Sequence, residues 1–130
     1  MKIGLSTDIG AGHDISMFRC ITDAIQVSKL YWRVIDASYK PLDINEAFYL
    51  ATIGGGSFFG KVGSFDKGYE ADIVIYDDEQ LKAPYKMTLN ERYERLLYLG
   101  NTSNVVTKYV SGKKVYDRKN EKENKKEVYN

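Results

Sequence analysis

The sequence predicts an α/β protein built from two structural units. Helical patterns alternate with short apolar or β-branched runs, and the character of the chain changes near residue 60. Before that point one strand-like segment is followed by helices, and after it three strand-like runs accompany one helix. We therefore divide the chain into residues 1–60, residues 61–117 and a charged tail, 118–130, that we expect to be disordered.

The first unit begins with a short apolar segment, residues 2–8, that reads as a buried strand. It ends at Asp8 before a glycine-bearing loop, as a strand does before a helix. Asp14 is positioned to cap that helix, and apolar residues recur at helical spacing beyond it. We expect the helix to run to about residue 35 and the chain to break before Pro41.

A second helix is predicted by Asp43 and Glu46, which have the spacing of a capping box. It ends in the stretch GGGSFFGKV, Gly54–Val62, whose spacing approaches that of a phosphate-binding loop. Such a loop needs a strand before its glycines and Ser or Thr directly after its lysine. Here a helix precedes the glycines and Val62 follows Lys61, so we interpret the stretch as a helix exit in which SFF packs inward.

The second unit contains a predicted strand over residues 73–76 and a helix that ends before Gly100. A hairpin with its turn at Ser111–Gly112 closes the unit. The strand of the first unit, in contrast, has no neighbour with which to form a sheet, and an apolar strand needs one. The chain therefore looks incomplete.

Composition excludes several function classes. The formal net charge is +1, which gives no field for nucleic acid, and no apolar run approaches the ~20 residues of a membrane span. No signal-peptide pattern follows Met1, so we expect a cytoplasmic protein. The single cysteine, Cys20, cannot form an internal disulfide. With one histidine as well, the chain cannot supply the usual nitrogen and sulfur ligands of a zinc site.

Asp8 is the strongest candidate for chemistry. A carboxylate at the carboxyl end of a parallel strand lies where α/β barrels hold their active sites, and it can bind a divalent metal and exchange a proton with water. The residues alone leave an equal alternative, in which Asp8 only caps the following turn. His13 could contact substrate, although an exposed or hydrogen-bonded histidine is commoner. Cys20 fits an inert buried thiol, and Asp77–Glu79 fits a solvated acidic turn better than a calcium site.

A resemblance to a known family rests on three stretches: LSTDIGAGHDISMF, INEAFYLATIGGGSFFGKVGSFDKGYEADIVIYDD and ERYERLLYLGNTSNVVTKYVSGKKVY. Together they resemble the carboxyl-terminal third of guanine deaminases, which belong to the metal-dependent amidohydrolase superfamily. The resemblance implies that residues 2–8 are the last strand of a (β/α)8 barrel. It also implies that residues 61–117 are the carboxyl-terminal strands, with one inserted helix, of a small composite β-sandwich.

The same resemblance implies a function. Asp8 matches the strand-eight aspartate, which in this family binds zinc and carries the proton between water and substrate, so Asp8 would be both catalytic residue and metal ligand. The implied reaction is the hydrolytic deamination of guanine to xanthine and ammonia, in purine catabolism, by a homodimer without nucleic-acid or membrane partners. The remaining zinc ligands of the family lie outside residues 1–130, so we expect this chain to be inactive by itself.

Two alternatives stay open. Another amidohydrolase-superfamily deaminase or a chlorohydrolase would use the same Asp8, because the substrate-facing residues would lie mostly outside this chain. A stand-alone, non-catalytic remnant acting as a scaffold or interaction module would need a partner that buries residues 2–8. Aggregation, or co-purification with a barrel half, would reveal such a module.

Overall fold

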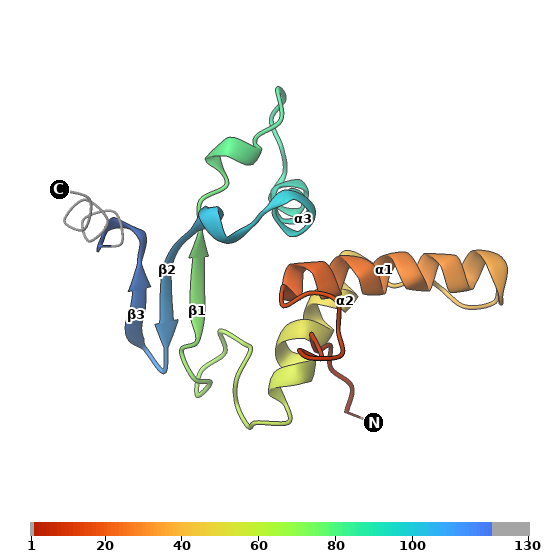
Figure 1. Cartoon of the computed structure of the whole chain (residues 1–130), viewed down its shortest axis with the longest axis horizontal. Helices are drawn as coiled ribbons and strands as arrows, with labels where there is room; N and C mark the ends of the chain where they lie inside the picture. Colours follow the sequence, from red (N-terminus) through yellow and green to blue (C-terminus); the bar gives the residue numbers. More distant parts are fainter. Residues whose placement is uncertain (1, 121–130) are drawn as a thin grey trace.

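The computed structural model describes residues 2–120, which fold into three main α-helices and one three-stranded sheet. The sheet and the helices lie side by side, and the first helix extends away from the body (Figure 1). Among the described residues no helix combines the length and the apolar character needed to cross a membrane. The tail that we expect to be disordered is residues 118–130, and its residues from 121 onward lie outside the described range.

Helix α1, Met17–Val34, begins two residues later than predicted. Ser16 is its N-cap and accepts a hydrogen bond from the backbone N–H of Arg19. Asp14 instead accepts the N–H of Ser16 at 2.8 Å, because an aspartate readily bonds the backbone two residues ahead. The prediction of Asp14 as the helix cap is therefore wrong by two residues, whereas the predicted helix end near residue 35 is confirmed.

Helix α2, Ile44–Tyr49, has the predicted capping box. The Asp43 carboxylate accepts the N–H of Glu46 at 2.9 Å, and the Glu46 carboxylate accepts the N–H of Asp43 at 2.9 Å. The helix continues into a π-helical turn, Leu50–Gly54, so the glycines do follow a helix as expected.

The core lies where three helices meet: α1, α2 and α3, Leu89–Leu99. Its buried centre is small and consists of four residues whose exposed fractions are at most 3%: Ile21, Ile25, Ala47 and Leu97. A ring of partly buried apolar side chains surrounds it: Leu5, Phe18, Leu42, Ile44, Ala51 and Tyr93. Because α1 contributes half of the buried centre, the position of this helix depends directly on that core.

The sheet is antiparallel in the order β1-β2-β3, with β1 at Ile73–Tyr76, β2 at Val105–Val110 and β3 at Lys113–Asp117. The predicted hairpin between β2 and β3 is confirmed. Its turn residues Ser111 and Gly112 have φ angles of 47° and 74°, the left-handed geometry of a tight two-residue hairpin.

The predicted strand over residues 2–8 does not form within the described residues. The N–H of Leu5 donates to the carbonyl of Leu50 at 2.9 Å, but the segment joins no sheet. A strand exists only beside another strand, and the described part of the chain offers no parallel neighbour at this place. The outer edge of β1 pairs with no described segment either, and Val74 and Ile75 are exposed there.

Candidate functional site

Asp8 lies on a tight turn between the segment 2–7 and α1. Its φ angle is +46°, a left-handed conformation that aspartate adopts more readily than most residues. Its carbonyl oxygen accepts the N–H groups of Ala11 at 2.9 Å and Gly12 at 2.5 Å, and its own N–H donates to Ser6 Oγ at 3.3 Å. The backbone polar groups of Asp8 are therefore used by the turn itself.

The Asp8 carboxylate, in contrast, is exposed and makes no hydrogen bond or ion pair with another described residue. It does not cap the turn, because the turn is closed through the backbone carbonyl. An exposed carboxylate without a partner suits an oxygen ligand of a divalent metal. Within residues 2–120 no group of three or more His, Cys, Asp or Glu residues could hold such an ion.

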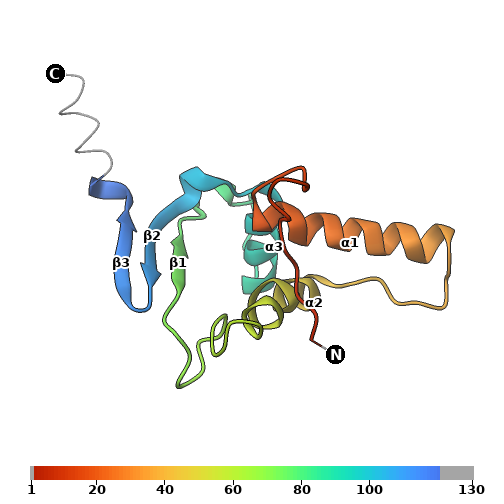
Figure 2. The same cartoon turned by 60° about the horizontal axis from the view of Figure 1, so that its bottom comes forward.

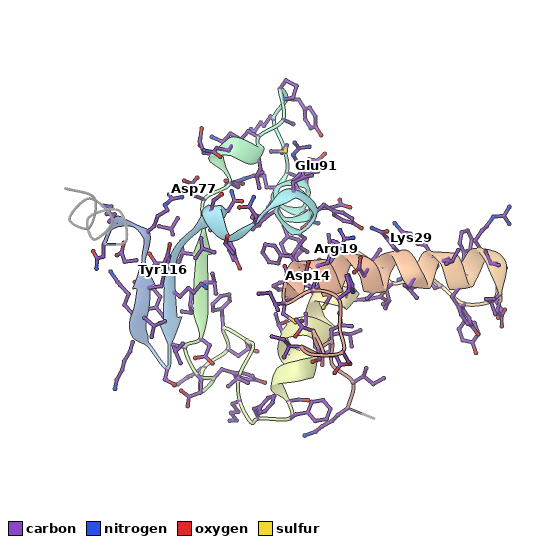
Figure 3. The ribbon with its side chains drawn as sticks, viewed as in Figure 1. Asp14, Arg19, Lys29, Asp77, Glu91 and Tyr116 are labelled. Atoms are coloured by element: carbon purple, nitrogen blue, oxygen red, sulfur yellow. The ribbon has the colours of Figure 1, made fainter. Side chains whose placement is uncertain are left out.

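His13 is turned toward α1. Its Nε2 lies 3.0 Å from a carboxylate oxygen of Asp23, whose other oxygen lies 3.3 Å from Nε of Arg19. The side chains of His13 and Asp23 are 70% and 27% exposed, so the contact is a surface pair that ties the loop to the helix. Figure 3 places Asp14 and Arg19 at this end of α1. Sequence reasoning missed Asp23; its i, i+4 spacing from Arg19 was the available signal.

The stretch Gly54–Val62 is helical through residue 56 and continues as a loop over residues 57–62. Gly60 has a φ of +115°, which a glycine adopts without strain. The expectation that SFF packs inward is wrong for the two phenylalanines: Phe58 is 60% and Phe59 86% exposed. No described segment covers them, so they border an open hollow of about 840 Å³. The segment that leads to Asp8 lines the same hollow with residues 4–7.

A second, apolar groove of about 630 Å³ separates the helices from β1. Phe18 and Tyr76 line it and pack directly against each other, with ring centroids 5.2 Å apart, and Phe48 packs edge-on against Tyr93 at 5.0 Å. The hydroxyl of Tyr93 is buried and has no hydrogen-bond partner among residues 2–120, and burial raises its pKa. A buried hydroxyl of this kind costs stability until a donor or acceptor reaches it.

The acidic turn after β1 serves the fold rather than a metal. Asp78 accepts two hydrogen bonds from the Arg92 guanidinium, at 2.7 and 2.9 Å, and Asp77 lies 2.9 Å from Nη2 of Arg118. These arginine hydrogen bonds hold the pKa of each carboxyl below its usual value. Glu79 pairs with Lys82. Cys20 is a free, partly exposed thiol, less buried than expected.

Comparison of the sequence and structure with known proteins identifies the family of this chain. The profile of the amidohydrolase family matches residues 1–115. A guanine deaminase of Escherichia coli K12 is 33% identical over 126 residues, which cover 91% of this chain and 27% of the relative. A guanine deaminase of Dictyostelium discoideum is 31% identical over 88% of this chain and 27% of its own length.

The crystal structure of a guanine deaminase from C. acetobutylicum, with guanine bound in its active site, superposes with a TM-score of 0.81 and 45% identity. The superposition covers 87% of this chain and 27% of that protein. The chain thus spans about a quarter of the length of these relatives. The predicted α/β class is confirmed, as is the match to one part of a larger amidohydrolase fold.

Proposed function

Because this chain belongs to the amidohydrolase family, we propose that it supplies one part of a zinc-dependent guanine deaminase, in which Asp8 is a metal ligand and the proton shuttle. The observation that carries the proposal is the exposed, unpartnered carboxylate of Asp8 within a chain similar to guanine deaminases along most of its length. We also propose a cytoplasmic, homodimeric enzyme with guanine and water as its small-molecule partners.

Asp8 would perform two tasks. As an anionic oxygen ligand it would hold the metal together with ligands from the rest of the enzyme. Zinc, when bound, supplies a Lewis acid that makes water a nucleophile at neutral pH. As a base, Asp8 would accept the proton of the attacking water and return it to the departing amine, so that guanine yields xanthine and ammonia. Because the turn is closed through the backbone carbonyl of Asp8, the carboxylate makes no hydrogen bond to another described residue, which supports this role.

The isolated chain is expected to hold well under one zinc ion per molecule and to show no deaminase activity. Zinc takes three or four protein ligands, and the described residues offer no group of three. Elemental analysis of the purified 130-residue protein, with the C. acetobutylicum relative prepared alongside, measures this. Stoichiometric zinc in the isolated chain would contradict the proposal that the other ligands lie elsewhere.

Substitution of Gly12 tests whether the geometry of the turn at Asp8 matters to activity. A Cβ atom at this position would overlap the carbonyl oxygen of Thr7, so Gly12→Ala must move the backbone that carries Asp8. In a chimera in which residues 2–117 of this chain replace the matching part of the C. acetobutylicum enzyme, we expect kcat to fall by roughly 10²-fold, the effect of misplacing a catalytic group by about 1 Å.

The matched control is Ala11→Ser, since Ala11 is exposed and its N–H bond to Asp8 does not involve its side chain. We expect the control to retain both the activity and the thermal midpoint of the unsubstituted chimera. Equal activity of Gly12→Ala and Ala11→Ser would show that the geometry of this turn does not matter to catalysis.

A further inference from the structure

The π-helical turn Leu50–Gly54 lies beside segment 2–7, the stretch of chain that leads to Asp8. Both views show the beginning of the chain running along α2 and its continuation (Figures 1 and 2). The N–H of Leu5 donates to the carbonyl of Leu50 at 2.9 Å, and among the described residues this is the one backbone hydrogen bond between segment 2–7 and another element. Because the segment joins no sheet, this helix end is the place where its backbone is held.

Two glycines allow the two backbones to touch there. A Cβ atom on Gly54 would lie 2.5 Å from the carbonyl oxygen of Ile3, and a Cβ atom on Gly4 would lie 2.6 Å from Cα of Gly55. Backbone atoms do not approach a real Cβ atom within 3.0 Å, so a larger residue at either glycine must push the segment away from the turn. We call this approach of the two backbones the glycine contact.

Neither glycine is needed for the conformation of its own backbone. Gly4 and Gly54 are not among the described residues whose φ is positive, and Gly54 lies in a helical turn, where alanine is favoured over glycine. Gly54 therefore does not end the helix in the way that a left-handed C-cap glycine does. The close approach of segment 2–7 is the requirement that explains a glycine at both positions.

We propose that Gly4 and Gly54 are positioning residues, which hold segment 2–7 against the π-helical turn and so fix the backbone from which Asp8 extends. This inference rests on the proposed role of Asp8 as a metal ligand. Leu5 lies three residues before Asp8 and its side chain packs against the core cluster, so the glycine contact connects the site with the most buried part of the described chain. A metal ligand binds well only where its backbone is held in place.

Hydrogen exchange of the backbone amides in the 130-residue chain, resolved by residue with NMR, tests the contact without metal or substrate. In Gly54→Ala the new methyl group would overlap the Ile3 carbonyl, so we expect the N–H of Leu5 to exchange roughly 10-fold faster or more. Gly55→Ala is the matched control. Its Cβ would meet its nearest neighbours, the carbonyl oxygens of Leu5 and Leu50, at 3.6 Å, which is an ordinary contact, so the exchange of Leu5 should stay unchanged.

Gly4→Ala tests the same contact from the other backbone. Gly4 lies outside every helix, so this substitution does not alter the π-helical turn from within, and we expect the same acceleration at Leu5. The N–H of Ile25, in the buried centre of the core, is the reference and should keep its exchange rate. Equal acceleration of Leu5 and Ile25 in Gly4→Ala would contradict the proposal, because the glycines would then maintain the whole fold and not the segment.

The chimera with the C. acetobutylicum enzyme connects the contact with Asp8. We expect Gly54→Ala and Gly4→Ala to raise the zinc dissociation constant by roughly 10- to 100-fold, the usual effect of losing the support of a metal ligand. The value of kcat should fall with a smaller change in KM, because a displaced Asp8 impairs the reaction more than the binding of guanine. Gly55→Ala should retain all three values. Competition with a chromophoric chelator measures the dissociation constant independently of activity.

Two further results would overturn the proposal. One is unchanged exchange of Leu5 in both Gly54→Ala and Gly4→Ala. The other is unchanged zinc affinity of these two variants in a chimera whose zinc binding is weakened by Asp8→Asn. Failure of the proposed function gives a different pattern: Asp8→Asn would leave zinc affinity unchanged, whereas the Leu5 amide of the 130-residue chain would still respond to Gly54→Ala. The glycine contact would then be supported and the role of Asp8 refuted.

Discussion

Replacing Asp8 by Asn is expected to lower kcat/KM for guanine deamination by roughly 10³-fold or more in the chimera with the C. acetobutylicum enzyme. Asparagine keeps the size of the side chain and one oxygen ligand, but its amide cannot accept the proton of the attacking water. General acid–base catalysis alone contributes 10²- to 10⁴-fold, and weaker metal binding adds to the loss. Ammonia release from guanine measures the rate, and the zinc content of each preparation separates the two contributions.

The control for this substitution is Asp14→Asn. Asp14 is exposed, lies on the same loop, and uses its carboxylate to accept the N–H of Ser16, a bond that the asparagine oxygen also accepts. We expect the control to stay within about twofold of the unsubstituted chimera, as a surface substitution does. Comparable losses for both variants would mean that the loop tolerates no change in charge, and the specific role of Asp8 would then be refuted.

Local signals in the sequence predicted most of the secondary structure. The capping box of Asp43 and Glu46 and the turn at Ser111–Gly112 depend on residues that are neighbours in the chain, and both formed as expected. The cap of α1 shows the limit of such signals, since Asp14 and Ser16 are both good caps and only the structure distinguishes them.

Two stretches suited to burial remain uncovered within the described residues for the same physical reason. Residues 2–8 read as a strand and SFF as an inward-facing turn, because apolar sequence predicts burial. Burial needs a second surface, and the described chain provides none at either place. The sequence therefore indicates which residues are suited to burial, whereas their exposure in the structure depends on whether the described chain provides a second surface to cover them.

The site was predictable in position and not in detail. Asp8 stood out because a carboxylate between an apolar segment and a glycine loop is a recurrent place for chemistry, and the structure leaves its carboxylate without a partner. The left-handed turn and the contact between His13 and Asp23 involve backbone conformation and spatial pairing that no spacing rule gives. The role of Asp8 itself came from the resemblance and remains a prediction.

Truncating Ile21 to Ala is expected to lower the free energy of unfolding of the chain by about 2–5 kcal/mol, the usual cost of emptying a well-packed core position. Ile21 is 2% exposed and lies at the centre of the cluster that joins α1 to α2 and α3. Domains have about 5–15 kcal/mol of stability in total, and the buried centre here is small, so the loss should take much of what holds the helices together.

Urea unfolding followed by circular dichroism, at one fixed protein concentration, measures the difference, with Ile15→Ala as the matched control. Ile15 is 74% exposed, so the same truncation there should cost within about 0.5 kcal/mol. Equal effects at the two positions would show that the helices are not held by this core. A large effect at Ile21 alone would show that this core fixes the position of α1, the helix whose Asp23 contacts His13 on the loop after Asp8.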